Sequence, residues 1–323
     1  MNQLLLLGLQ ESTQWSLVWV VGVALFVGLI VFSYTSRSGI IARATTKEAV
    51  RQPLFFLIFF MATVLLVLNT FIPFFTLGDD IRELKNTGLS TLLISGILLA
   101  VWTAGNTITS EIEGKTAMTL LSKPINRRQF IIGKYLGILQ GVLCLLIPLT
   151  LIFSFLIYYK VGFENRANLA GEIPGWFDWI KVGSVSLPGP NMDRLAEVTQ
   201  VLPGIILAFF QIAVLTGISV AVATRLPMIA NLINCFVIFI IGNLTPQMVA
   251  HSKSSIENEQ AIFVARLVAT IMPSLNSFDI YGVLARGGSV PPTYLATAML
   301  YAVAYVAATI LFAFILFEDR DLA

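Results

Sequence analysis

The sequence has little charge, two cysteines and a single histidine. Only 12% of its 323 residues are charged, whereas a soluble globular protein usually has about 25%. With 57% hydrophobic residues as well, the chain is not a disordered segment, a DNA-binding protein or a typical soluble enzyme. Cys144 and Cys235 both lie in apolar stretches and predict neither a disulfide framework nor a thiolate metal site. His251 has no Cys/His cluster around it, so the residues give no reason to expect a bound metal.

The sequence contains several long apolar stretches without charged residues. An α-helix needs about 20 such residues to cross a bilayer, where its backbone must bond within its own segment. We predict an all-α polytopic membrane protein with seven transmembrane helices, at residues 15–34, 53–77, 89–108, 130–158, 201–224, 226–244 and 294–317. Their interiors contain no acidic residue. The one internal base, Lys134, lies near enough to the start of its span to reach the interface.

The positions of Lys and Arg indicate the orientation of the spans. Segments 35–52 and 109–129 are rich in bases, which places them in the cytoplasm, with the N-terminus outside and the C-terminus inside. We interpret 15–34 as a retained helix and not a signal peptide, because residues 1–14 contain no Lys or Arg. The expected organisation is one membrane domain, 35–323, preceded by an extra transmembrane helix in 1–34. In the outer segments, 175–181 has the aromatic residues of an interfacial segment and 188–190 predicts a turn.

The first basic segment carries Arg43, Lys47 and Arg51 at positions i, i+4 and i+8. On a helix these side chains lie on one face. Pro53 follows where the next helix can begin. The segment is either a short helix along the inner membrane surface or an ordinary positive-inside loop, and the two interpretations have equal weight.

The second basic segment contains two helix starts. Ser110 and Glu113 form a capping-box pattern, which predicts a helix over about 111–122 that ends before Pro124. Asn126 with Gln129 three residues later marks the next start. Arg127 and Arg128 then lie in a first turn, where the helix dipole disfavours cations. We therefore expect anionic lipid headgroups or an acidic partner to offset them.

Gly114-Lys115-Thr116 looks like the end of a phosphate-binding loop but is not one. The full pattern requires glycine at position 109, where this chain has Thr109, and it requires a preceding strand. We therefore expect no nucleotide site in this chain.

The stretch from Ile112 to Gly137 resembles the signature of ABC-2 type permeases. The matching residues are Ile112-Glu113-Gly114-Lys115-Thr116, Leu120-Leu121-Ser122-Lys123-Pro124-Ile125, Arg127-Arg128 and Gly133-Lys134-Tyr135-Leu136-Gly137. Residues 42–53 are similar to the family's N-terminal elbow helix, and 317–322 resemble its usual ending. The resemblance is strongest to the subgroup for multicopper-enzyme maturation, which includes the nitrous-oxide-reductase assembly permease. The family has six spans with a cytoplasmic N-terminus, and this chain adds one in front.

The resemblance implies a permease subunit of an ATP-driven exporter in the bacterial inner membrane. It would work with a separate ABC ATPase, as a homo- or heterodimer, with no cofactor and no catalytic residue of its own; ATP would bind the partner, and nucleic acid would have no part. Residues 111–122 would be a cytoplasmic coupling helix. The implied ATPase-coupling residues are Glu111, Glu113, Gly114, Thr116, Leu120, Leu121, Pro124, Arg127 and Arg128, and those of the elbow helix are Arg43, Lys47 and Arg51.

Two other functions compete with this one. An ion-coupled secondary transporter usually carries ionisable residues at mid-membrane, and the predicted spans have none there. A membrane scaffold or assembly subunit that transports nothing stays open. The spans do contain amides, which either line a path or bond between helices: Asn69, Asn106, Gln140, Gln211, Asn231, Asn234 and Asn243.

Overall fold

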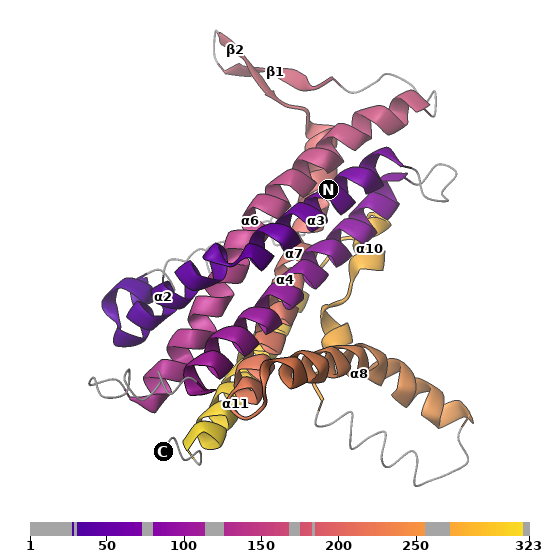
Figure 1. The fold of residues 1–323 in the computed structure, drawn as a ribbon. Coiled ribbons are helices and arrows are strands. Elements are labelled where there is room, and N and C mark those ends of the chain that lie inside the picture. Colours follow the sequence, from indigo (N-terminus) through magenta and orange to yellow (C-terminus); the bar gives the residue numbers. More distant parts are fainter. Residues whose placement is uncertain are drawn as a thin grey trace, which may run out of the picture.

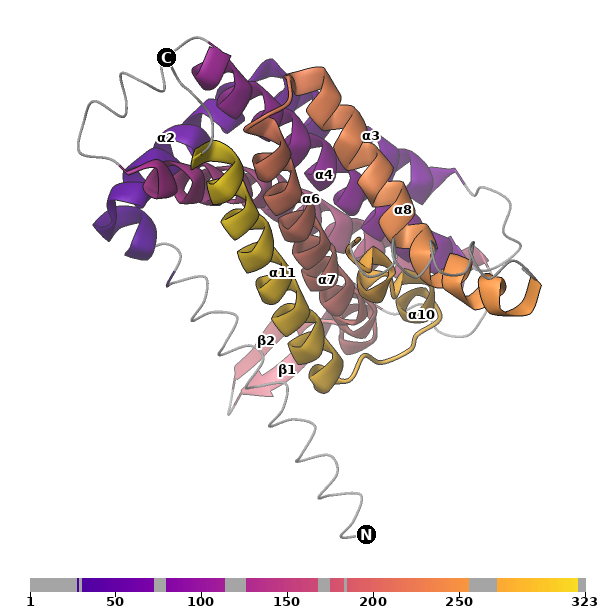
Figure 2. The ribbon, with the colours of Figure 1, turned by 90° about the horizontal axis from the view of Figure 1, so that it is seen from below.

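The computed structural model describes residues 28, 31–72, 80–113, 126–167, 175–182, 185–255 and 272–318. Most of these residues form long helices that run together as one bundle, and α8 turns away from it (Figure 1, Figure 2). In chain order the elements are α2 Arg37–Arg51, α3 Pro53–Phe71, α4 Asp80–Glu113, α6 Arg127–Ala167, β1 Phe177–Val182, β2 Val185–Pro190, α7 Met192–Ala223, α8 Met228–Ser255, the 3-10 turn η1 Leu275–Phe278, α10 Tyr281–Ala285 and α11 Pro292–Glu318.

Five described helices are long and apolar enough to cross a membrane, namely α3, α4, α6, α7 and α11. They confirm five predicted spans, and the chain is a polytopic helical membrane protein. The apolar part of α8, Met228–Leu244, is shorter. Of the predicted first span, only its last residues lie within the described chain, where 31–34 are helical. Seven spans therefore stays a prediction.

The predicted span ends are wrong for the three central helices. Helices α4, α6 and α7 include three stretches that we expected in loops beyond the spans, namely residues 80–88, 159–167 and 192–200. With 34 residues α4 is about 51 Å long, and α6 with 41 residues is about 60 Å, against about 30 Å of hydrocarbon. Both helices therefore extend beyond the membrane.

The segment between α6 and α7 contains the one sheet in the part of the chain that is described. Strands β1 and β2 form an antiparallel hairpin in which Trp179 pairs with Pro188 and Phe177 with Pro190. The predicted turn at 188–190 is therefore wrong, because these residues lie in β2. The Trp176 ring packs against Tyr158 and Tyr159 of α6 at centroid distances of 6.1 Å, which fixes the hairpin to the end of that helix.

The segment before α11 packs into the bundle. Leu275 and Phe278 of η1 are fully buried with apolar residues of α7 and α11. Leu284 of α10 lies against Gly204 of α7, beside Leu89 of α4. The chain therefore packs between these helices near the C-terminal half of α8 and the N-terminal half of α11.

Candidate functional site

The end of the bundle predicted to face the cytoplasm brings together the last turn of α4, the first turns of α6, the end of α11 and the helix α2 (Figure 1). The chain between α4 and α6, residues 114–125, lies outside the described residues. Five of the predicted coupling residues therefore lie outside them as well: Gly114, Thr116, Leu120, Leu121 and Pro124. The structure describes how the two ends of this segment are held.

The helix predicted to start at Ser110 does not start there. Helix α4 runs without a break through Glu113, and the Ser110 hydroxyl donates to the Asn106 carbonyl within the same helix. The capping-box prediction is therefore wrong. Glu111 and Glu113 lie in the last turn of α4, where the helix dipole disfavours acids, and not in a first turn that favours them.

An ion pair compensates Glu111. Lys134 Nζ of α6 donates to Glu111 Oε1 over 2.8 Å. The Lys134 side chain is only 3% exposed and the Glu111 side chain 24% exposed. The prediction that Lys134 snorkels to the interface is therefore wrong. It instead fixes the end of α4 to the second turn of α6.

The predicted start of α6 at Asn126 is confirmed. The Asn126 N–H donates to Gln129 Oε1 over 3.3 Å, and its carbonyl accepts from the Phe130 N–H. Arg127 lies in the first turn, as predicted, but its partner is in the same chain. Its guanidinium donates to the Glu318 carbonyl over 3.0 Å and to the Phe317 carbonyl over 3.4 Å.

These bonds join two helix ends of opposite dipole. The carbonyls at the end of α11 attract a cation, and Arg127 supplies it from the start of α6. The Phe130 and Phe317 rings stack beneath this contact at 5.7 Å. These carbonyls offset the charge of Arg127 from within the chain. Arg128, the next residue, is exposed and lines a cleft with Asn126 and Glu318.

Helix α2 confirms the helical interpretation of 35–52. It begins at Arg37, where the Ser36 hydroxyl accepts from the Gly39 N–H over 2.9 Å, and it ends at Arg51. Pro53 begins α3, as predicted. Lys47 and Arg51 are exposed, whereas Arg43 is half-buried with its guanidinium 4.7 Å from the Tyr34 ring centre.

A row of glycines on α6 lets α2 approach closely. A Cβ at Gly137 would lie 2.5 Å from the Ala42 carbonyl oxygen, and one at Gly133 would lie 2.7 Å from the Ile41 Cβ. Thr46 donates to the Gly137 carbonyl over 3.0 Å. Small residues four apart allow such close packing in membrane helices. Helix α2 is thus packed tightly along the first half of α6.

Sequence reasoning missed three contacts in this region: Lys134 with Glu111, Arg127 with the end of α11, and the Thr109 hydroxyl with the Leu226 carbonyl at 3.4 Å. A signal was present for the first two. Lys134 belongs to the Gly133–Gly137 motif, and Phe317-Glu318 is the ending that resembled the family. Residues of both motifs form the contacts between α4, α6 and α11 at this end of the bundle.

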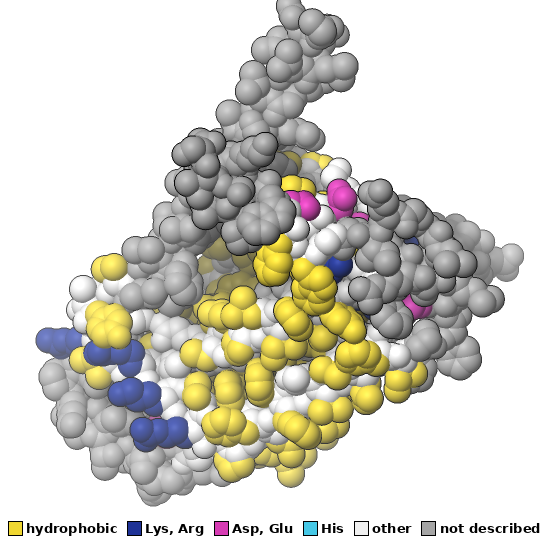
Figure 3. Space-filling model, turned by 90° about the horizontal axis from the view of Figure 1, so that it is seen from above, with side chains coloured by type: hydrophobic (Ala, Val, Ile, Leu, Met, Phe, Trp, Pro, Cys, Tyr) yellow, Lys and Arg dark blue, Asp and Glu magenta, His cyan; other side chains and the backbone are white. Residues whose placement is uncertain are grey.

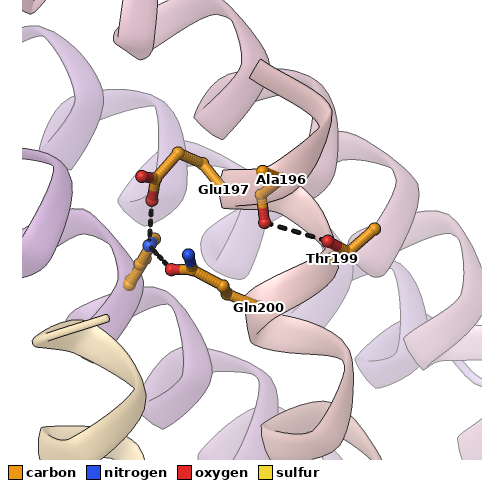
Figure 4. A network of polar contacts seen from close by, with 5 residues as sticks. Ala196, Glu197, Thr199 and Gln200 are labelled. Carbon is orange, nitrogen blue, oxygen red and sulfur yellow. Dashed lines mark hydrogen bonds and ion pairs between the residues drawn. The ribbon is translucent and has the colours of Figure 1, made fainter. Parts of the chain in front are cut away.

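The opposite end buries three cations between helices. Lys85 of α4 pairs with Glu197 of α7 and donates to Gln200 over 2.8 Å (Figure 4). Lys160 of α6 pairs with Asp80 over 3.0 Å and donates to the Thr70 carbonyl. Arg194 of α7 forms a third contact between helices, because it donates to the Tyr158 carbonyl of α6 over 2.9 Å. Each cation is 2% exposed.

Several amides within the bundle bond between helices. Gln211 of α7 donates to Asn243 of α8 over 3.4 Å, and Asn231 of α8 donates to Ser219 of α7 over 2.9 Å. Gln140 of α6 accepts from Thr46 of α2 over 3.0 Å. For these residues the helix-bonding interpretation is confirmed.

Comparison with known proteins agrees with this architecture. A family model described as "ABC-2 family transporter protein" matches residues 9–322, which is nearly the whole chain. No curated protein matches the chain.

Proposed function

Because the chain belongs to the ABC-2 family of transporter proteins, we propose that it is the permease subunit of an exporter powered by a separate ABC ATPase. ATP binds and is hydrolysed on that partner, and this chain contributes no catalytic residue and no cofactor. Its own part is to receive a movement at the cytoplasmic end and to change the packing of its membrane helices.

The coupling element is the segment 114–125 together with the helix ends that hold it. Glu111 and Glu113 lead into it from α4, and Arg127 and Arg128 follow it at the start of α6. In this proposal Gly114, Thr116, Leu120, Leu121 and Pro124 form the surface that contacts the ATPase. The elbow helix α2, with Arg43, Lys47 and Arg51, positions α6 from the side.

The Lys134–Glu111 ion pair is the observation that supports this proposal best. A loop that moves freely would pass little force to the membrane. Here the pair links both ends of the segment to each other, and Arg127 links the start of α6 to α11. A push on 114–125 therefore acts on α4, α6 and α11 together.

Further parts of the proposal rest on the family. Two copies of the chain, or this chain and a related one, assemble with two ATPases in the bacterial inner membrane. The division into an extra helix at 1–34 and a permease domain at 35–323 remains part of the proposal. The motif at 112–137 favours a role in the maturation of a multicopper enzyme, but the proposal assigns no metal to this chain.

Ion coupling is less favoured. The ionisable residues of α4, α6 and α7 lie toward the helix ends, and in α4 none occurs between Lys85 and Glu111. Lys85, Lys134 and Lys160 each have a carboxylate partner. A coupling ion needs an ionisable group near mid-membrane.

The test is co-purification of the tagged full-length chain with an ATPase encoded beside its gene. Arg128→Glu reverses an exposed charge at the proposed contact, and Arg225→Glu makes the same change in the turn between α7 and α8. We expect Arg128→Glu to reduce several-fold both the amount of ATPase that co-purifies and the rate of ATP hydrolysis by the complex. Arg225→Glu should leave both quantities near wild type. Equal effects of the two variants would reject the coupling surface. Transport that survives ATP depletion but stops when the ion gradient is collapsed would replace the proposal with ion coupling.

A further inference from the structure

The corner between α2 and α3 holds a groove with a basic edge. It is lined by Ala44, Lys47, Glu48, Arg51, Gln52 and Pro53. The Lys47 and Arg51 side chains are exposed, and neither has an acidic partner among the described residues. Glu48 is the one acid in the lining, so the groove keeps a net positive charge.

Gln52 adds an unused hydrogen-bonding group to this groove. It is the residue between the two helices, serving as C-cap of α2 and N-cap of α3. Both atoms of its side-chain amide, Oε1 and Nε2, are buried and have no hydrogen-bond partner within the described chain. A buried amide without a partner costs free energy unless a ligand or water completes its bonds.

An exposed apolar wall begins where the groove ends. Phe56, Leu57 and Phe60, in the first turns of α3, are 60%, 58% and 65% exposed. Figure 3 shows Lys and Arg side chains gathered at one end of a broad apolar surface. Along the chain, the exposed base Arg51 and the exposed Phe56 lie on either side of Pro53, where α3 starts.

We propose that this groove binds one anionic phospholipid of the membrane leaflet on which α2 lies. The phosphodiester oxygens accept from Arg51, Lys47 and the Gln52 amide, and the acyl chains lie along Phe56 and Phe60. Charge complementarity selects an anionic headgroup, and the adjoining apolar wall selects a lipid over a free phosphate. The bound lipid supports the corner through which α2 is joined to the first spanning helix after it.

The test uses the full-length protein purified in a neutral detergent. Phosphatidylglycerol is titrated in, and retained lipid is counted by native mass spectrometry, with phosphatidylcholine and inorganic phosphate as comparison probes. We expect phosphatidylglycerol to bind as one lipid per chain in preference to phosphatidylcholine. The double variant Lys47→Gln/Arg51→Gln should weaken its binding about 25-fold, since each base near a membrane surface contributes about fivefold.

Three matched variants separate a built site from general surface charge. Arg225→Gln removes an exposed base of the α7–α8 turn and should leave retention of the lipid unchanged. Glu48→Gln removes the acid of the groove and should tighten binding. Gln52→Leu changes no charge and should weaken it. The proposal would be overturned if Arg225→Gln and Arg51→Gln lost equal amounts of retained phosphatidylglycerol, or if the double variant bound the lipid as wild type does. It would also be overturned if inorganic phosphate bound as well as phosphatidylglycerol.

Discussion

Lys134 and Glu111 form an ion pair between two helices that the chain connects through residues 114–125. The donor–acceptor distance is 2.8 Å, and the lysine is almost fully buried. Glu111 lies in the last turn of α4, where the dipole disfavours it, so Lys134 compensates both the charge and its position. The pair thus closes the base of the proposed coupling segment.

We predict that Lys134→Met lowers the free energy of unfolding by about 2–3 kcal/mol. Removing one partner of a buried pair costs about 3–5 kcal/mol, and the quarter of Glu111 that remains exposed reduces this cost. Thermal unfolding of the purified chain measures the change. Adding Glu111→Gln should recover part of the loss, because no unpaired carboxylate then remains. A double variant less stable than Lys134→Met would contradict the pairing.

The contact between α2 and α6 predicts a strong effect at Gly137. In Gly137→Ala the new Cβ would lie 2.5 Å from the Ala42 carbonyl oxygen, so the two helices must separate. Overpacking of this kind costs about 1–3 kcal/mol. Gly282→Ala is the control, since a Cβ there meets nothing within 4 Å. We expect only Gly137→Ala to lower the melting temperature; equal stability of the two variants would rule out the close packing.

The sequence predicted the middles of the spans better than their ends. Uncharged apolar stretches mark the hydrocarbon core directly, and five of them are helices as expected. The extra turns of α4 and α7 contain Lys85 and Glu197, which look like loop residues when hydropathy alone is considered. Both residues are helical, Lys85 is almost fully buried, and the two side chains pair across 112 residues of sequence. No local pattern contains that information.

The two predicted helix starts near the coupling segment had different outcomes for a similar reason. Asn126 begins a helix and Ser110 does not, although both carry a capping pattern. A serine inside a continuing helix can bond back to the carbonyl four residues earlier, as Ser110 does with Asn106. The capping pattern fits both positions. Ser110 does not start a helix because α4 continues through it.

The ion pair of Lys85 and Glu197 should also contribute strongly to stability. In Glu197→Gln the buried Lys85 ammonium, 2% exposed, loses its carboxylate partner and keeps its hydrogen bond to Gln200. We expect a loss of about 2–4 kcal/mol in unfolding free energy, measured by thermal unfolding. Lys85→Met combined with Glu197→Leu should recover most of it. Asp193→Asn, an exposed acid in the first turn of α7, is the control and should cost less than about 1 kcal/mol.

Arg127 and Arg128 are neighbours with different hydrogen-bond partners, and this difference gives the sharpest test of the contact between α6 and α11. Both side chains are exposed, but of the two only Arg127 donates to the last carbonyls of α11. Arg127→Gln removes the cation from the end of α11, so its last turn should open more often. We expect amide hydrogen exchange in the last turn of α11 to accelerate about fivefold, which corresponds to about 1 kcal/mol for a lost helix-end cation. Arg128→Gln should leave that exchange unchanged while reducing binding of the ATPase. If both variants accelerated exchange equally, the contact between α6 and α11 would not depend on Arg127, and the link from the coupling segment to α11 would fail.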